Sequence, residues 1–292
     1  MNCPEMLELI EPLAQVDGFY KTLVPSVCLF SSRQPKPRTP IMYEPSICII
    51  AQGSKVGFLG DRVIPYNSGH YLVQTLPLPF ECETYASEEN PLFGIAVTLD
   101  APVLAELVME TGGQQYPQDE QSCPKPMDSV AMTKSMREAV MRLLRALHDP
   151  QTAKLMGEGR VREVIYEALL GEQGKAMRAL VHNQGNYSRI VRVLNQMRSE
   201  LADEISVDQL ARQANMSVST FHQHFKQVTR ASPLQYLKRL RLIKAQLLLN
   251  QNELNVTQTA SAVGYKSVNQ FSRDYKRYFG ISPTYEKRGE VA

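Results

Sequence analysis

The sequence has few cysteines, few histidines in its first half and no long apolar run. Its five cysteines are an odd number, and none lies in a CxxC or Cys/His spacing, so disulfides and a structural zinc are not expected. The longest apolar stretches, such as Ile47 to Ala51, are far too short to span a membrane, and the acidic start MNCPEMLELIEP lacks the features of a signal peptide. These absences predict a cytoplasmic protein without a membrane segment.

Catalytic and metal-binding patterns are missing as well. A metal-dependent β-barrel enzyme needs two or three imidazoles around one ion, yet His70 is the only histidine between Met1 and Leu147. The sequence contains no GxSxG, phosphate loop or dinucleotide fingerprint. We therefore expect no metal, no cofactor and no enzymatic activity.

Three side chains of the first half are candidates for contact with a small molecule, namely Cys48, His70 and Cys82. Cys48 has two interpretations: a small buried apolar residue, or a thiol that captures an electrophile if its pKa is depressed. His70 is interpreted first as a hydrogen-bonded structural residue and second as a ligand-binding group.

Basic and acidic residues nearly cancel over the chain, at 32 and 30, but they are unevenly distributed. Residues 186–292 hold 16 basic and 8 acidic side chains, a net of +8, whereas residues 1–185 hold 16 and 22, a net of −6. This asymmetry indicates a nucleic-acid-binding unit joined to a different kind of domain. We place the boundary of the two domains at residues 185/186.

The acidic part begins with a β pattern and ends with a helical one. From about Val24 to Leu99, short apolar runs alternate with turn formers, which is typical of an antiparallel sandwich or a small barrel, and Gly60 marks a hairpin turn. Helical spacing then predicts helices over residues 101–112, 129–148, 152–170 and 175–182. Their Met and Leu stripes, which include Met136, Leu143 and Leu155, pack either in the core or against a second subunit.

The basic part contains a repeat at an offset of 50 residues, because Ser217, Phe221 and Phe225 match Ser267, Phe271 and Tyr275. In each copy a short helix, a turn and a second helix follow one another, with Ser206, Ser217 and Ser267 as helix caps. The sequence thus predicts two helix-turn-helix units.

A connector helix is expected between the two copies, from Ser232-Pro233 to about Leu249. It would span roughly 27 Å and hold two reading helices near the spacing of about 34 Å between successive major-groove faces. Its expected inward residues are Leu234, Leu237, Leu240, Ile243, Leu247 and Leu248.

Polar side chains remain on the outer faces of the two second helices. Asn and Gln can pair with adenine and Arg with guanine, so these faces can read base edges. Basic side chains nearby are expected to contact phosphates, which orients the protein without specifying a sequence. The expected phosphate contacts are Lys226, Arg230, Lys238, Arg239, Arg241, Lys244, Lys276 and Arg277.

The runs FHQHFKQVTRASPLQYLKRLRLIKAQLLL and VGYKSVNQFSRDYKRYFGISPTYEKR resemble the DNA-binding domain of the AraC/XylS transcription regulators. Two residues depart from that pattern: Arg230 stands where the family usually has glycine, and Thr259 where it usually has an aliphatic residue. The resemblance implies base contacts by Ser219, His222, Gln223, Val268, Asn269 and Arg273.

The segments YEPSICIIAQGSK, LGD, YLV and PLFGIAVTLD resemble the cupin-like N-terminal domain of one branch of that family. The resemblance implies an α+β protein, with an N-terminal cupin-like β-barrel and helical extension (1–185) and an all-α C-terminal domain (186–292) with two helix-turn-helix motifs and a connector helix. It further implies a transcription activator that binds double-stranded DNA, RNA polymerase and a small-molecule effector, and that can form a homodimer. Two alternatives stay open: a metabolite-acting cupin-type enzyme tethered to DNA, and a non-specific architectural DNA binder.

Overall fold

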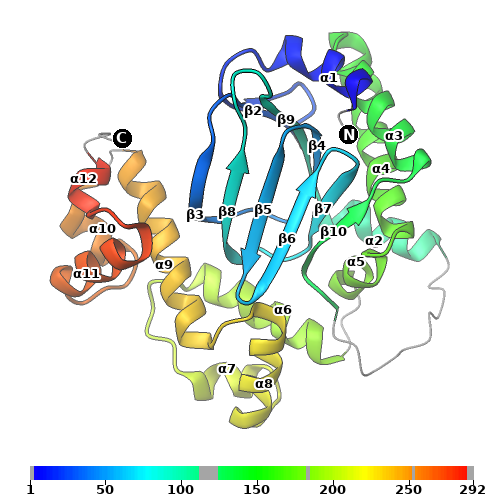
Figure 1. Ribbon diagram of the computed structural model, residues 1–292. Coiled ribbons are helices and arrows are strands. Elements are labelled where there is room, and N and C mark those ends of the chain that lie inside the picture. The colour runs from blue at the N-terminus through cyan, green and yellow to red at the C-terminus, as the bar shows by residue number, and fades with distance from the viewer. Residues whose placement is uncertain (1–2, 112–123, 182–184, 252–253, 288–292) are drawn as a thin grey trace. The chain divides into compact units, whose positions relative to one another are not determined.

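The computed structural model describes residues 3–111, 124–181, 185–251 and 254–287. The chain divides into two units (Figure 1). The first contains residues 1–38, 43–77 and 82–183, and the second contains residues 184–292 together with Thr39–Met42 and Leu78–Glu81.

Two β-sheets form the framework of the N-terminal part. The six-stranded sheet has the order β1-β2-β9-β4-β7-β10, and the four-stranded sheet has the order β3-β8-β5-β6 (Figure 1). The strands are β1 (Gly18–Lys21), β2 (Val27–Ser32), β3 (Lys36–Met42), β4 (Ser46–Gln52), β5 (Ser54–Leu59), β6 (Arg62–Asn67), β7 (His70–Gln74), β8 (Pro79–Tyr85), β9 (Leu92–Thr98) and β10 (Met127–Ala131).

The turn expected at Gly60 joins β5 to β6. Leu59 pairs with Arg62 across this antiparallel hairpin, and Gly60 has a φ of +64°, which glycine adopts without steric cost. The hairpin prediction is confirmed.

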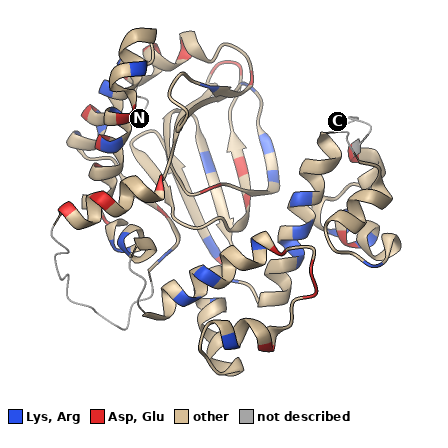
Figure 2. Cartoon of the chain, turned by 180° about the vertical axis from the view of Figure 1, so that it is seen from behind, with Lys and Arg blue, Asp and Glu red and all other residues tan. Residues whose placement is uncertain are grey.

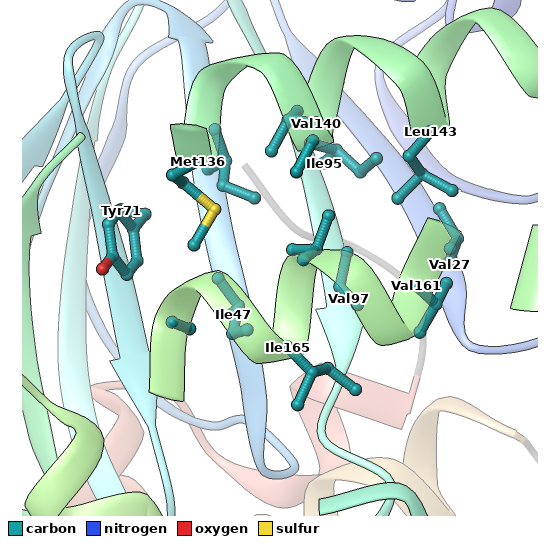
Figure 3. Close-up of a cluster of buried hydrophobic side chains, with 14 of the residues drawn as sticks. Val27, Ile47, Tyr71, Ile95, Val97, Met136, Val140, Leu143, Val161 and Ile165 are labelled. Atoms are coloured by element: carbon teal, nitrogen blue, oxygen red, sulfur yellow. The ribbon is translucent and has the colours of Figure 1, made fainter. Parts of the chain in front are cut away.

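Helices cover one face of the six-stranded sheet (Figure 3). Alternate residues of β4, Ile47 and Ile49, point to this face and pack with Met136 and Val140 of α3 and with Ile165 of α4, all of them fully buried. The helices of this part are α1 (Pro4–Ile10), the short 3-10 turn η1 (Glu11–Leu13), α2 (Ala101–Glu110), α3 (Lys134–Ala146), α4 (Pro150–Leu170) and α5 (Gly174–Val181).

Three expectations for the N-terminal part need correction. The two sheets remain separate, so the architecture is a sandwich rather than a closed barrel. The helix expected from Ser129 begins at Lys134, because residues up to Ala131 pair with β7 as strand β10 and Thr133 caps the helix. Leu155, expected in a packing stripe, is 71% exposed. His182 and Cys123 lie outside the described residues.

Seven helices make up the described C-terminal part: α6 (Gly185–Ser199), α7 (Val207–Gln213), α8 (Val218–Thr229), α9 (Pro233–Asn250), α10 (Val256–Ala262), α11 (Val268–Phe279) and α12 (Pro283–Lys287). The expected caps are present, since the hydroxyls of Ser206, Ser217 and Ser267 each accept a hydrogen bond from the backbone N–H three residues later.

The connector helix α9 runs as expected, but its buried face was only partly identified. Leu237 and Leu240 are buried as predicted, whereas Leu234 and Leu247 are 61% and 50% exposed. Three other residues of α9, Leu242, Ala245 and Leu249, are buried and contribute to the core of the second copy. The prediction omitted Leu242 and Leu249, and it also missed the buried Ala245 and Tyr236.

Candidate nucleic-acid interface

The helices α8 and α11 have the same construction in the two copies. One face of each is aromatic and fully buried, with Phe221 and Phe225 in α8 and Phe271 and Tyr275 in α11. Phe225 meets the ring of Tyr236 on α9 edge to face, with 5.6 Å between ring centroids. Each reading helix is therefore held by its apolar side, and its polar side remains available.

The turns before these helices differ by one residue. The first helices α7 and α10 are 49 positions apart, while α8 and α11 are 50 apart, so the second turn is one residue longer. Both turns use a left-handed residue at the equivalent place, Asn215 with φ +51° and Gly264 with φ +79°. Both also carry the same pattern of backbone hydrogen bonds, from Met216 to Ala211 and from Tyr265 to Ala260.

The residues expected to read bases lie on the polar faces of the two helices. Ser219, His222 and Gln223 are exposed on α8, and Asn269 and Arg273 are exposed on α11, while Val268 is half-buried at the start of α11. Within the described residues, Arg273 forms no ion pair that would compete with a base. The structure thus leaves five of the six side chains accessible to a ligand.

The expected phosphate contacts fall into two groups. Lys226, Arg230 and Lys276 are exposed, and Arg239 is half-buried. Figure 2 shows Lys and Arg along α9, a helix that contains no acidic residue. Arg241 is different, because its guanidinium donates to the backbone carbonyls of Leu201 and Asp203 at 2.7 and 2.9 Å. It holds the chain before α7 in place.

A buried carboxylate, Asp274, binds two more of the expected phosphate contacts. Asp274 Oδ1 lies 2.6 Å from Lys238 Nζ and 2.8 Å from Arg277 Nη2, and its side chain is only 6% exposed. Gln270 and Tyr265 donate to its second oxygen. Although burial opposes ionisation, the hydrogen bond and charge of Lys238 hold the pKa of Asp274 below its usual value.

Asp274 borders a pocket of about 240 Å³ between α9 and α11, which Lys238, Arg239 and Arg277 also line. Arg277 is 73% exposed and can still approach a phosphate, whereas Lys238 is more enclosed, at 35%. The sequence analysis missed Asp274, since no local pattern shows that a residue of α11 faces a lysine 36 positions earlier on α9.

A second missed contribution comes from α6. The amide of Asn186 lies 3.1 Å from His224 Nε2 on α8, and Arg189 donates to the carbonyl of Asn215 in the first turn. These contacts attach α8 and its preceding turn to α6, in addition to the aromatic contact between α8 and α9.

The three candidate effector contacts lie in the sheets of the N-terminal part. His70 is hydrogen-bonded to Asn67 at 3.0 Å, which fits its structural interpretation. Cys48 and Cys82 are buried, and burial raises the pKa of Cys48 to about 12, the opposite of an activated thiol. Within the described residues no group of His, Cys, Asp and Glu could hold a metal, and no helix there is long and apolar enough to cross a membrane.

Two family models match the chain. The model described as AraC-type transcriptional regulator N-terminus matches residues 23–176, slightly more than half of the chain, and a helix-turn-helix domain model matches residues 210–288. The chain belongs to the AraC family of transcriptional regulators. The family resemblance of both halves is thereby confirmed, and the α+β class agrees with it.

Curated relatives of this AraC-family chain are regulators too. The chain is 34% identical over 127 residues to the HTH-type transcriptional regulator GbdR of Pseudomonas aeruginosa. This match covers 43% of the chain and 35% of the relative. The chain is also 36% identical over 129 residues to the HTH-type transcriptional activator RhaS of Escherichia coli, covering 44% of the chain and 46% of the relative. The matches thus span less than half of these relatives.

The fold has counterparts among solved structures. Apo ToxT K231A of Vibrio cholerae matches 90% of this AraC-family chain and 97% of its own, with a TM-score of 0.60 and 9% identity. At that identity the similarity concerns the fold alone, and it extends over both the sheets and the helical part.

Proposed function

We propose that this AraC-family chain is a sequence-specific DNA-binding transcription regulator whose helices α8 and α11 enter successive major-groove segments. The observation that carries the proposal is the duplicated capped helix with an anchored aromatic face and an exposed polar one. Base edges are read by Ser219, His222, Gln223, Val268, Asn269 and Arg273. Phosphates are contacted by Lys226, Arg230, Arg239, Lys276 and Arg277.

The two parts of the chain, which differ in net charge, have different roles in this proposal. Residues 186–292 bind the operator, and residues 1–185 bind a small-molecule effector or hold a dimer. The effector acts by binding one arrangement of the domains more tightly than another, which shifts the population on DNA. Activation through contact with RNA polymerase in the cytoplasm is the proposed output, and the activator name of the relative RhaS supports it.

The proposal is tested by selecting bound DNA from a random pool with purified full-length protein at a stated, near-physiological salt concentration. Two conserved blocks about one helical turn apart are expected, because each reading helix contacts one major-groove segment. A pool that binds tightly but yields no motif, with and without candidate metabolites, would instead support an architectural DNA binder.

A variant pair separates base reading from phosphate contact on the same helix. Arg273→Ala should lose roughly 1–3 kcal/mol of binding, concentrated at one base position of the selected motif. Lys276→Ala should weaken binding to all sequences about equally and reduce the salt dependence. Both effects are measured by titrating point-substituted operators in a fluorescence anisotropy assay, and a uniform loss for Arg273→Ala would remove it from the base-reading set.

A further inference from the structure

The α6–α7 loop, residues 200–206, belongs to the first helix-turn-helix copy by its place in the chain. It follows Ser199, the last residue of α6, and it ends at Ser206, the cap of α7. Yet this loop is fastened to the second copy and to the connector α9. Contacts of four kinds hold it there: an apolar contact, a pair of hydrogen bonds, a close backbone approach and an ion pair.

Leu201 makes the apolar contact. Its half-buried side chain packs against the core of the second copy, which contains Leu242 of α9 and Phe271 of α11. A side chain from the loop of the first copy thus extends the hydrophobic core of the second.

Arg241 of α9 makes the pair of hydrogen bonds. Its Nε donates to the carbonyl of Leu201 at 2.7 Å, and its Nη2 donates to the carbonyl of Asp203 at 2.9 Å. A guanidinium is planar, so two bonds from one fork fix both the position and the direction of the loop backbone. Each bond has a charged donor, which makes it stronger than a bond between neutral groups.

The same loop lies against the turn that precedes α11. A Cβ at Gly264 would lie 2.4 Å from the carbonyl oxygen of Ala202, so the two backbones are in direct contact. Lys266 forms an exposed ion pair with Glu204, which adds little because water screens both charges. The next residue, Ser267, caps α11. The loop therefore reaches the base of the second reading helix.

We propose that the α6–α7 loop positions the second copy relative to the first, so that α8 and α11 meet DNA as one rigid body. The inference rests on the proposed function, in which these two helices read successive major-groove segments. A helix that alone joined two copies could bend along its length, and a second link far away in sequence restrains that motion. Leu201 and Arg241 are positioning residues in this arrangement, because they act through the reading helices.

Rigid positioning has a consequence for specificity. Two linked binding modules gain affinity only when both can engage at once, so a rigid pair rejects operators with the wrong spacing between blocks. One base pair inserted between the blocks moves the second block by about 3.4 Å and turns it by about 34°. A protein with a loosened loop can follow that movement, and a protein with the loop in place cannot.

The test uses full-length protein and three DNAs: the two-block DNA from the selection experiment, the same DNA with one base pair inserted between the blocks, and DNA with the first block only. The unaltered protein should bind the inserted DNA at least about tenfold more weakly than the two-block DNA. In Arg241→Met, which keeps the aliphatic stem and removes the donors, this ratio should fall to about threefold or less. Affinity for single-block DNA should stay the same, because each copy remains folded.

Arg212→Met is the matched control, since it makes the same change in charge at an exposed arginine of α7 outside the loop. Its spacing ratio should equal that of the unaltered protein. Leu201→Ala loosens the loop without any change in charge and should lower the ratio as Arg241→Met does. It also decides the matter if Arg241→Met does not fold.

A second readout needs no DNA. Nitroxide labels are attached through ketone-bearing amino acids at the positions of Ser219 and Asn269, which are equivalent exposed sites on α8 and α11. Double electron–electron resonance should give one narrow distance distribution, and Arg241→Met and Leu201→Ala should widen it at least about twofold. The control Arg212→Met should leave the width unchanged.

Two results would overturn the role of the α6–α7 loop: an unchanged distance distribution in both loop variants, or a spacing ratio that stays at about tenfold in both. An equal loss of affinity for all three DNAs in Arg241→Met would make Arg241 a phosphate contact instead. If the selection yields no motif but the distribution widens as expected, the proposed function fails and the positioning role stands. A recovered motif with an unchanged spacing ratio has the reverse meaning.

Discussion

Arg230 ends α8 in the left-handed conformation, with φ +57° and ψ +21°, and its amide closes the helix by donating to the carbonyl of Lys226. At the equivalent end of α11 stands Gly280, with φ +81°. The second copy therefore uses the residue type that this backbone favours, and the first does not. Arg230, which departs from the family pattern in sequence, therefore also carries backbone strain that a glycine would not have.

Replacing Arg230 with glycine should raise the free energy of unfolding by up to about 1 kcal/mol, because the Cβ that strains the left-handed residue is removed. The measurement is urea unfolding of the full-length protein followed by circular dichroism. Arg230→Ala is the control, since it removes the same charge and keeps the Cβ. A gain of equal size in both variants would assign the effect to charge.

Thr259 is the second residue that departs from the family pattern, and its hydroxyl affects stability. Thr259 is fully buried in α10, and its Oγ1 has no hydrogen-bond partner among the described atoms. Thr259→Val keeps the shape and removes the unsatisfied group, so stability should rise by roughly 1–2 kcal/mol. Thermal unfolding measures the change.

The matched control is Thr229, which is also buried, at 3% exposure, but has a satisfied hydroxyl. Its Oγ1 donates to the carbonyl of Phe225 at 2.8 Å and accepts from the amide of Ala231. Thr229→Val should therefore destabilise the protein by about 1–2 kcal/mol. If Thr259→Val and Thr229→Val change the stability in the same direction, hydrogen bonding of the hydroxyl does not explain either change.

Single residues were predictable from the sequence where their role is local. The caps Ser206, Ser217 and Ser267 follow from a hydroxyl just before a helix, and they are confirmed. Asp274 owes its role to partners that are brought close only by folding, which no spacing rule reveals. The base-reading roles stay predictions, although exposure of those side chains is compatible with them.

At the scale of elements, the turns of the two helix-turn-helix units determine how each reading helix is presented. Gly264 is doubly constrained in the second turn: its φ is +79°, and a Cβ there would lie 2.4 Å from the carbonyl oxygen of Ala202. Gly280 has a similar φ of +81°, but a Cβ there would meet nothing within 4 Å. A substitution at Gly280 therefore tests backbone strain alone, and a substitution at Gly264 tests backbone strain together with steric overlap.

Gly280→Ala should cost about 1 kcal/mol, the strain of a left-handed alanine. Gly264→Ala should cost at least about 2 kcal/mol, because the packed chain before α7 must also move. Denaturant unfolding compares the two variants directly. Equal losses would show that the chain near Ala202 moves aside without cost.

Elements were predicted best where one periodicity continues for several turns. The connector α9 and both reading helices were located to within a residue or two, because their apolar spacing and caps agree. The last three residues of strand β10, Ser129 to Ala131, were assigned to a helix, since they precede a helical stripe without a visible break. Its pairing with β7, far away in sequence, decides its conformation.

At the scale of the whole molecule, the basic C-terminal part has fewer accessible cations than its composition suggests. Lys238 and Arg277 share the single carboxylate of Asp274, and the Arg241 guanidinium donates to backbone carbonyls. A phosphate that contacted Lys238 or Arg277 would have to compete with this internal carboxylate. Composition could indicate the sign of the charge, but only the folded structure shows which cations are already paired.

Asp274→Asn should increase affinity for DNA of any sequence and make the slope of log K against log salt steeper by about 1–2, as Lys238 and Arg277 become available to phosphates. Asp203→Asn, at an exposed acid, is the control with the same change in net charge. Titrations of non-operator DNA over a range of salt concentrations measure both slopes. If the two variants have equal slopes, Asp274 serves packing and does not restrain phosphate binding.

The single unbroken helix α9 between the two copies also limits how this architecture can change during evolution. An α-helix turns by about 100° and advances about 1.5 Å per residue, so one residue inserted in α9 would rotate the second copy by about 100° relative to the first. Seven inserted residues complete nearly two turns and nearly restore the direction of α11, but they displace it by about 10.5 Å along the helix axis. An insertion in α9 therefore changes either the direction or the distance between α8 and α11, so the length of this connector is more strongly constrained than its exposed side chains.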